Sequence, residues 1–193
     1  MRNIEKYYNN TQTEEPRKNV QYFIEKVKCN PSKAIELGCG AGNDTIYLIK
    51  NKWNVLSIDK EDTKERIIRR INKEELSKFS FQQQEFEDIK LENSKLIVAN
   101  YSLPFCKKDK LGELWNKIKA SITSEGYFVG NFFGLNDDWN GEKAEMTFLS
   151  KEQVIELFKD FEIIRFKETE KEALTGLGKM KHWHIFDIIA KKK

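Results

Sequence analysis

Residues 34–42 read AIELGCGAG, and residues 43–48 continue as NDTIYL. The apolar residues at the start of this stretch predict a short buried strand, and those after the glycines predict the beginning of a helix. A strand that ends in glycines before a helix allows the backbone to approach a ligand closely. Because glycines cost conformational entropy that a plain turn need not lose, we interpret this loop as a ligand site. Its three alternating glycines are Gly38, Gly40 and Gly42.

The loop differs from two familiar nucleotide-binding patterns. A dinucleotide fingerprint places its third glycine, or an alanine, where this chain has Asn43, which argues against a nicotinamide-dependent oxidoreductase. A phosphate-binding loop would end in Gly-Lys-Ser or Gly-Lys-Thr, which is absent. Two acids accompany the loop: Glu36 precedes it, and Asp59 ends the next predicted strand. Asp59 follows the glycines by roughly 20 residues, the spacing at which a carboxylate accepts the hydroxyls of a bound ribose.

The stretch from Glu36 to Gly42, taken together with Asp59, resembles the class I S-adenosylmethionine-dependent methyltransferases over roughly residues 34–134. In that family the glycine loop wraps the methionine part of the cofactor, and the acid after the second strand binds the ribose. Within the class, the chain is most similar to small single-domain enzymes of the tellurite-resistance or thiopurine type. The resemblance implies S-adenosylmethionine as cofactor, S-adenosylhomocysteine as product, and no metal.

Predicted strands alternate with predicted helices until the end of the chain, where two strands follow each other directly. This order predicts an α/β fold whose sheet is parallel except for one strand. The resemblance implies a Rossmann-like three-layer sandwich with seven strands in the order 3-2-1-4-5-7-6. Helices are expected to begin at Pro16 and to run from Lys60 through Ile71, and a loop is expected from Lys167 to Met180. The predicted strands span 34–37, 53–59, 79–85, 96–100, 126–134, 161–166 and 182–190.

The length of 193 residues accommodates a single α/β domain and leaves no room for a separate substrate domain. We expect residues 1–30 to form a lid segment and helix, 33–134 the cofactor-binding core, and 135–193 the substrate loops and the last two strands. Residues 1–16 are expected to become ordered when the cofactor binds. The polar segment 135–147 is the best candidate for a substrate loop, because it follows a strand of an open sheet.

The composition limits the partners of the protein. The formal net charge is +3, and charged residues make up 34% of the chain with both signs interspersed, which argues against a nucleic-acid partner. No apolar stretch reaches transmembrane length and the N-terminus lacks a signal-peptide core, so we expect a cytoplasmic protein with no membrane partner. The three cysteines share no metal-ligand spacing, as expected of reduced thiols. Both a monomer and a homodimer are compatible with the sequence.

Further cofactor contacts follow from the resemblance. Glu85 and Phe86, at the end of a predicted strand, correspond to an acid that accepts the adenine amino group and to an apolar wall beside it. Aspartate is commoner than glutamate there, and the neighbouring Glu87 or Asp88 would shift the register. The N-terminal segment of this family often folds over the cofactor, which brings Arg17 within reach of a carboxylate. The expected cofactor contacts are Arg17, Glu36, Gly38, Gly40, Gly42, Asp59, Lys60, Glu85, Phe86 and Asn100.

Methyl transfer from a sulfonium needs an acceptor atom held in line with the methyl group. Aromatic faces attract the cationic sulfonium and stack on an acceptor. A general base is needed only if the acceptor must lose a proton, and His184 and Tyr101 are then the catalytic candidates. His182 and His184 lie on one face of a predicted strand, but no third or fourth metal ligand is recognisable. The expected substrate contacts are Tyr8, Tyr101, Trp139 and His184.

These observations favour a methyltransferase that acts on a small-molecule acceptor, because the minimal chain offers no added recognition element. The segment from Asn100 to Phe105 reads NYSLPF and lacks the Asn-Pro-Pro-Tyr type of motif, which argues against nucleobase amino groups and glutamine as acceptors. Two alternatives are a protein or RNA methyltransferase on the same fold and a non-catalytic module that binds S-adenosylmethionine.

Overall fold

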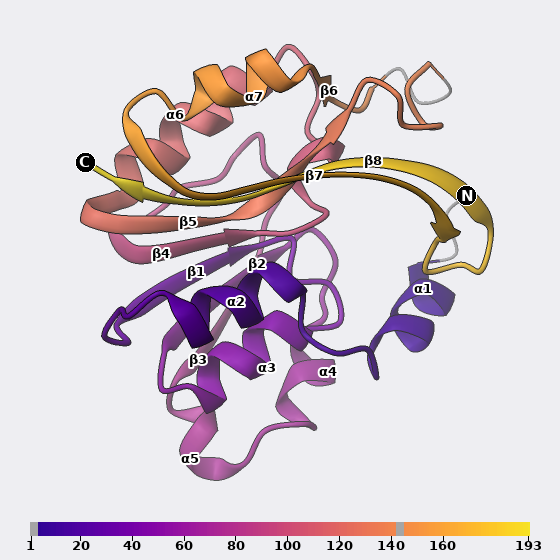
Figure 1. Ribbon diagram of the computed structural model, residues 1–193. Helices are drawn as coiled ribbons and strands as arrows, with labels where there is room; N and C mark the ends of the chain where they lie inside the picture. Colours follow the sequence, from indigo (N-terminus) through magenta and orange to yellow (C-terminus); the bar gives the residue numbers. More distant parts are fainter. Residues whose placement is uncertain (1–3, 142–144) are drawn as a thin grey trace.

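The computed structural model describes residues 4–141 and 145–193 (Figure 1). Residues 1–3 of the predicted lid segment and residues 142–144 of the predicted substrate loop lie outside this part. The strands are β1 Lys33–Leu37, β2 Asn54–Asp59, β3 Phe79–Gln83, β4 Ser94–Ala99, β5 Ile122–Gly134, β6 Phe148–Leu149, β7 Phe161–Leu174 and β8 Met180–Lys192. The helices are α1 Ile4–Thr11, α2 Lys18–Lys26, α3 Asn43–Lys50, α4 Lys64–Ile68, α5 Lys73–Leu76, the 3₁₀ turn η1 Leu103–Phe105, α6 Leu111–Ser121 and α7 Lys151–Leu157.

The main sheet has the strand order β3-β2-β1-β4-β5-β8-β7, and the short β6 pairs with β5 off this path. All neighbours are parallel except that β8 runs antiparallel to both β5 and β7. Because β7 and β8 are the sixth and seventh predicted strands, the expected order 3-2-1-4-5-7-6 is confirmed. Helices lie on both sides of the sheet, with α6 and α7 opposite α2 and α3 (Figure 1).

The central strands are apolar on both faces because helices cover both. In β4, Ile97 packs in the cluster that includes Trp115 of α6, and the neighbouring Leu96 packs on the other face with Phe23 of α2. This alternation explains why residues 96–99 form one continuous apolar run. The carboxyl ends of β1, β2 and β4 are thereby held side by side at one edge of the sheet.

The predicted loop from Lys167 to Met180 is wrong, because most of this segment belongs to the long β7–β8 hairpin. Leu174 pairs with Met180, so that the turn occupies only the residues between them. The charged sequence reads as a loop, but β7 is the last strand in the sheet order and exposes most of its charged side chains to solvent. Charged residues are suited to an edge strand because they oppose pairing with another chain.

Two helix predictions also need correction. The charged helix expected from Lys60 through Ile71 is shorter in the structure, where it is α4 alone, and the separate helix α5 follows after its N-cap residue Asn72. Asn72 suits the start of a new helix because its side chain accepts the backbone N–H of Glu75 at 2.9 Å. The helix expected from Pro16 begins at Lys18, after Arg17 as its N-cap residue. Within the described ranges, no helix combines the length and the apolar character that crossing a membrane requires.

A buried ion pair fastens the segment after β5 to β8. The Lys181 ammonium contacts the Asp137 carboxylate, and both side chains are almost completely buried. The same carboxylate accepts the backbone N–H of Trp139 at 3.0 Å, and the ammonium lies 3.7 Å from the ring centroid of Trp183. The ion pair therefore holds an aromatic cluster against the end of the sheet.

We predict that Lys181→Met lowers the free energy of unfolding by about 3–5 kcal/mol, because the Asp137 charge is left buried without its partner. Urea denaturation measures this change. The double variant Lys181→Met/Asp137→Asn, which removes both charges, should recover most of the loss. The control is Lys159→Met, which breaks an exposed pair with Glu156 and should change stability little. Equal stability of Lys181→Met and the control would contradict the prediction.

Candidate cofactor and acceptor site

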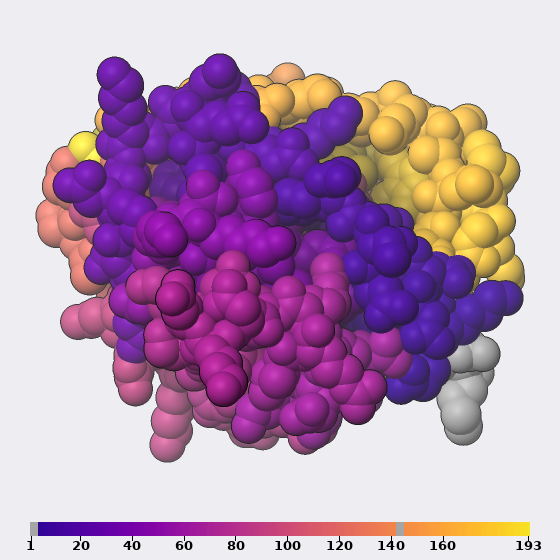
Figure 2. Space-filling view, turned by 90° about the horizontal axis from the view of Figure 1, so that it is seen from below, coloured from indigo at the N-terminus to yellow at the C-terminus, as the bar shows by residue number. Residues whose placement is uncertain are grey.

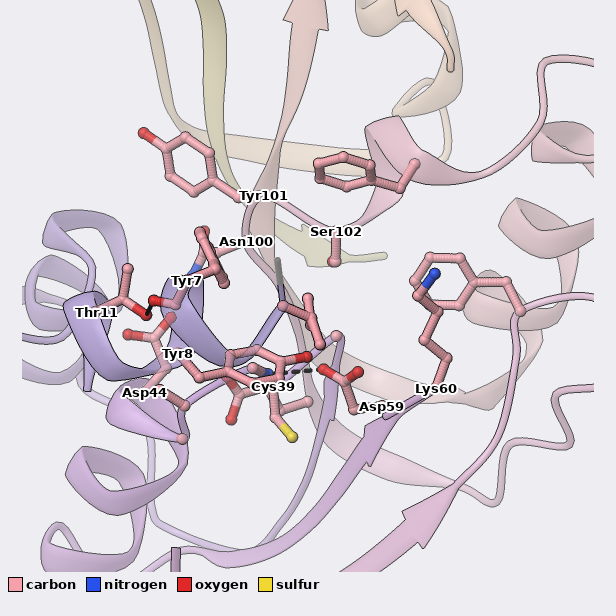
Figure 3. Close-up of a pocket in the computed structure, with 18 of the residues that line it drawn as sticks. Tyr7, Tyr8, Thr11, Cys39, Asp44, Asp59, Lys60, Asn100, Tyr101 and Ser102 are labelled. Carbon is pink, nitrogen blue, oxygen red and sulfur yellow. Dashed lines mark hydrogen bonds between the residues drawn. The ribbon is translucent and has the colours of Figure 1, made fainter. Parts of the chain in front are cut away.

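A cavity of about 260 Å³ lies at the carboxyl ends of β1, β2, β3 and β4 (Figure 3). The helix α1 forms part of its lining. Figure 2 shows the N-terminal segment, in indigo, beside the C-terminal strands, in yellow. The side-chain amide of Asn10 donates to the carbonyl of Gly176 at 3.0 Å, which ties the helix to the hairpin turn. The lining includes the predicted positions Tyr8, Arg17, Glu36, Gly38, Gly40, Gly42, Asp59, Lys60, Glu85, Phe86, Asn100 and Tyr101.

The glycine loop is compressed between neighbouring elements. Gly38 and Gly42 have φ angles of +71° and +82°, which L-residues with side chains rarely adopt. A Cβ atom on Gly38 would lie 2.4 Å from Cβ of Ser102, and one on Gly42 would lie 2.3 Å from Cγ1 of Ile67. Glycine is therefore required at both positions to let the loop fit between the end of β4 and helix α4.

Asp59 presents a buried carboxylate next to the loop. It accepts the backbone N–H of Gly40 at 2.8 Å and that of Glu61 at 3.0 Å. Burial raises the pKa of Asp59, and these two hydrogen bonds oppose the rise. The hydroxyl of Tyr8 points toward this carboxylate in Figure 3, and burial, followed by the charge of Asp59, raises the pKa of that phenol. Asp59 thus has hydrogen-bond acceptors on the cavity side, as a ribose hydroxyl requires.

Two more carboxylates, Glu36 and Asp44, are buried beside the same loop. Thr45 donates its hydroxyl to Glu36, and Asp44 accepts the backbone N–H of Arg17 at 2.6 Å and the side-chain amide of Asn100 at 2.8 Å. Burial is the largest cause that raises the pKa of both acids. A ligand with a cationic ammonium group would relieve this concentration of negative charge.

Tyr101 and Arg17 form another wall of the cavity. Tyr101 has a φ angle of +52°, and its backbone N–H donates to the Asn131 side chain at 2.8 Å. The guanidinium carbon of Arg17 lies 4.6 Å from the centroid of the Tyr101 ring. Burial raises the pKa of Tyr101 to about 12, against the opposing effect of Arg17, so that the phenol is protonated at neutral pH.

Two of the predicted substrate-contact residues, His184 and Trp139, do not line the cavity. His184 lies with its ring against Gly134, where a Cβ would be 2.1 Å from Nδ1. Trp139 packs behind Tyr101 in a cluster with Phe133 and Trp183, with ring-centroid distances of 6.1 and 5.5 Å. Neither residue is among those that line the cavity.

His184, Glu168 and Glu170 lie close enough to share an ion, but their hydrogen bonding gives them a different role. The Nδ1 atom of His184 accepts the backbone N–H of Asn136 at 3.2 Å, so the neutral ring carries its proton on Nε2. This Nε2–H lies 3.2 Å from a Glu168 oxygen. A metal-binding histidine instead donates from its second nitrogen, so we interpret this cluster as a hydrogen-bonded element of the hairpin.

Several lining residues were not predicted. Asp44 is the second residue of α3. An acidic residue so soon after the glycines could have been predicted as part of the ligand site. Tyr7 comes from α1, which the polar N-terminal sequence did not indicate. Ser102 and Phe105 follow β4, and Ser102 has a buried hydroxyl oxygen with no hydrogen-bond partner in the described part of the chain.

These features fit S-adenosylmethionine. The glycines provide a cradle that side chains would fill, Asp59 offers acceptors for a ribose, and the buried acids suit an ammonium group. Lys60, Glu85 and Phe86 line the cavity near the ends of β2 and β3, where an adenine ring would extend. The fold and this site define a class I S-adenosylmethionine-dependent methyltransferase.

Comparison with known proteins identifies the family more closely. Residues 2–176 match the family described as "Tellurite resistance protein TehB", and the chain belongs to that family. The structure resembles TehB from Haemophilus influenzae with a TM-score of 0.76 and 18% identity, over 97% of this chain and 66% of that one. It also resembles the N-methyltransferase NodS from Bradyrhizobium japonicum, solved with S-adenosylhomocysteine, with a TM-score of 0.72 and 14% identity over 98% and 96% of the two chains.

A curated relative shares the sequence over a shorter region. It is the carboxy-S-adenosyl-L-methionine synthase of Nautilia profundicola, which is 34% identical over 99 residues. This alignment includes 50% of the present chain and 42% of the relative, so it spans less than half of the relative's length.

We predict that Asp59→Ala raises the dissociation constant for S-adenosylhomocysteine at least tenfold, because charge-assisted hydrogen bonds of about 1.5–3 kcal/mol are lost. Isothermal titration calorimetry on both proteins measures the change. The control is Asp62→Ala, an exposed acid three residues further along the chain. Unchanged affinity of Asp59→Ala would contradict the ribose assignment.

We also predict a pH-dependent gain in stability for Glu36→Gln. Because the folded-state pKa of Glu36 is raised, its stabilising contribution is present at low pH and is lost as the pH rises through that pKa. The variant should therefore unfold at higher urea concentration than the wild type at about pH 7, and the difference should shrink by about pH 5. The exposed Glu74→Gln is the control. A pH-independent difference would contradict the prediction.

Proposed function

We propose that this protein transfers a methyl group from S-adenosylmethionine to a small-molecule acceptor. The observation that carries the proposal is the partial cover that α1 gives the cavity, to whose lining it contributes Tyr7, Tyr8 and Thr11. When bound, the cofactor supplies the electrophilic methyl group and the leaving group. The chain itself has to orient the acceptor and exclude water.

Contacts with three other parts of the fold hold α1 over the cavity. Arg66 of α4 donates to the side chain of Asn9 at 2.9 Å and also pairs with Glu5. The side-chain amide of Asn43, in the first turn of α3, donates to the carbonyl of Thr11 at 2.8 Å. With the hydrogen bond from Asn10 to the hairpin, these contacts tie the cover to separate parts of the fold. A cavity partly covered in this way favours an acceptor that enters whole over one presented by a folded macromolecule.

The acceptor end of the cavity has aromatic walls. Tyr7, Tyr101 and Phe105 line it, and Arg17 places its guanidinium over Tyr101. Aromatic faces attract the positive charge of a sulfonium and stack on planar or polarisable acceptors. Arg17 also donates its backbone N–H to Asp44, which places the guanidinium near the buried acids and suits the carboxylate of the cofactor.

The protonation of Tyr101 bears on the kind of acceptor. With a pKa of about 12, this phenol holds its proton throughout the physiological range and does not serve as a base. His184, the other candidate base, hydrogen-bonds Glu168 outside the cavity lining. We therefore propose an acceptor that reacts as a soft anion, such as a thiolate or a chalcogen oxyanion, for which no base is needed.

We predict that the pH profile of the rate follows the acceptor. With thiols of different pKa, the midpoint of kcat/KM should move with the thiol, and Tyr101→Phe should shift no midpoint and reduce kcat by less than about tenfold. The measurement uses labelled S-adenosylmethionine with a panel of thiols, amines, phenols and chalcogen oxyanions. A fixed midpoint with all thiols would indicate a base in the protein. Activity confined to protein or RNA would overturn the small-acceptor proposal.

A further inference from the structure

Ser102 lines the cavity after the end of β4. The residue is 5% exposed, and its hydroxyl oxygen has no hydrogen-bond partner in residues 4–141 and 145–193. Two other buried side-chain oxygens in these ranges share this property, on Asn19 and Ser94, but neither residue lines the cavity. Burying a hydroxyl without a partner is unfavourable, so its retention at a ligand site points to a partner supplied by the ligand.

The position of Ser102 follows from the chain around it. Tyr101 adopts its left-handed conformation directly after Asn100, and Phe105 donates its backbone N–H to the Ser102 carbonyl at 2.9 Å. This turn places the Ser102 side chain over Gly38, close enough that a Cβ there would lie 2.4 Å from the serine Cβ. Figure 3 shows the hydroxyl pointing into the cavity, toward the side where Asp59 lies.

The sheet order indicates which part of the cofactor this hydroxyl meets. Along the edge, the strands follow as β3, β2, β1 and β4, and Asp59 ends β2. With the adenine near β3 and the ribose at Asp59, the next part of the cofactor, at the ends of β1 and β4, is the sulfonium. Ser102 and Gly38 stand at those two ends. A hydroxyl oxygen there places negative partial charge beside a positive one.

We infer that Ser102 is a binding residue that recognises the charged sulfonium of S-adenosylmethionine and so favours the cofactor over the uncharged S-adenosylhomocysteine. This inference rests on the cofactor of the proposed function, and it assigns no proton transfer to the serine. It makes Ser102 the residue that distinguishes the substrate form of the cofactor from its product.

The test compares Ser102→Ala with wild type by calorimetric titration of both compounds, without turnover. We expect the dissociation constant for S-adenosylmethionine to rise about three- to tenfold, because a charge–dipole attraction of about the strength of one hydrogen bond is lost, and that for S-adenosylhomocysteine to change less than twofold. The ligand-free variant should be at least as stable to urea as wild type, because an unpartnered buried hydroxyl has been removed. Ser94→Ala, which removes the orphaned hydroxyl at the start of β4, should share this stability and leave both affinities unchanged.

Each other outcome overturns the inference in a distinguishable way. An equal loss of affinity for both compounds would assign the hydroxyl to a part that they share, and unchanged affinity for both would remove it from cofactor binding. A loss of stability in ligand-free Ser102→Ala would show that the hydroxyl has a structural partner. Failure of the wild type to bind either compound would instead overturn the cofactor assignment on which the inference rests.

Discussion

The structure depends on a steric constraint at the carboxyl edge of the sheet, where the glycine loop passes between two neighbours with no room for side chains. Ser102 contacts the loop at Gly38, and Ile67 contacts it at Gly42. Gly38 and Cys39 both donate their backbone N–H groups to the carbonyl of Ile58, at 2.8 and 3.2 Å. These contacts bring the ends of β1, β2 and β4 together, so Asp59 and Ser102 share one cavity. The glycines therefore serve packing as well as the close approach of a ligand.

The buried carboxylates around the cavity destabilise the ligand-free protein. Glu36, Asp44 and Asp59 are all buried, and burial raises the pKa of each. Hydrogen bonds from Thr45, Asn100 and the backbone reduce this cost without removing it. Sites that break local rules in this way are expected where a ligand completes the arrangement. Here a ligand with a cationic group and hydroxyls would satisfy the same acids.

The lining of the cavity around the glycine loop was largely predictable because its signals are local. The glycine spacing, Glu36 and Asp59 lie within about 25 residues, and the apolar run of β4 is nearly continuous. Predictions failed where tertiary structure overrides the local pattern. The charged β7 reads as a loop until its edge position is known, and the polar α1 gains its stability from contacts such as those with Arg66 and Gly176. Ser102 carries no sequence signal, since only its burial without a partner distinguishes it from any serine.

The aromatic side of the cavity, which we propose as the acceptor end, is built by a different kind of interaction. This explains why the sequence identifies the cofactor more readily than the acceptor. Tyr101 packs edge-on against Phe133 and Trp183, residues far from it in the chain. The Lys181–Asp137 ion pair holds this cluster, and the Lys181 ammonium lies 4.4 Å from the Trp139 ring centroid. The shape of this aromatic side thus depends on a buried charge pair behind it as well as on the residues that line it. A substitution in that cluster would alter the aromatic side of the cavity while leaving Asp59 and the glycine loop intact.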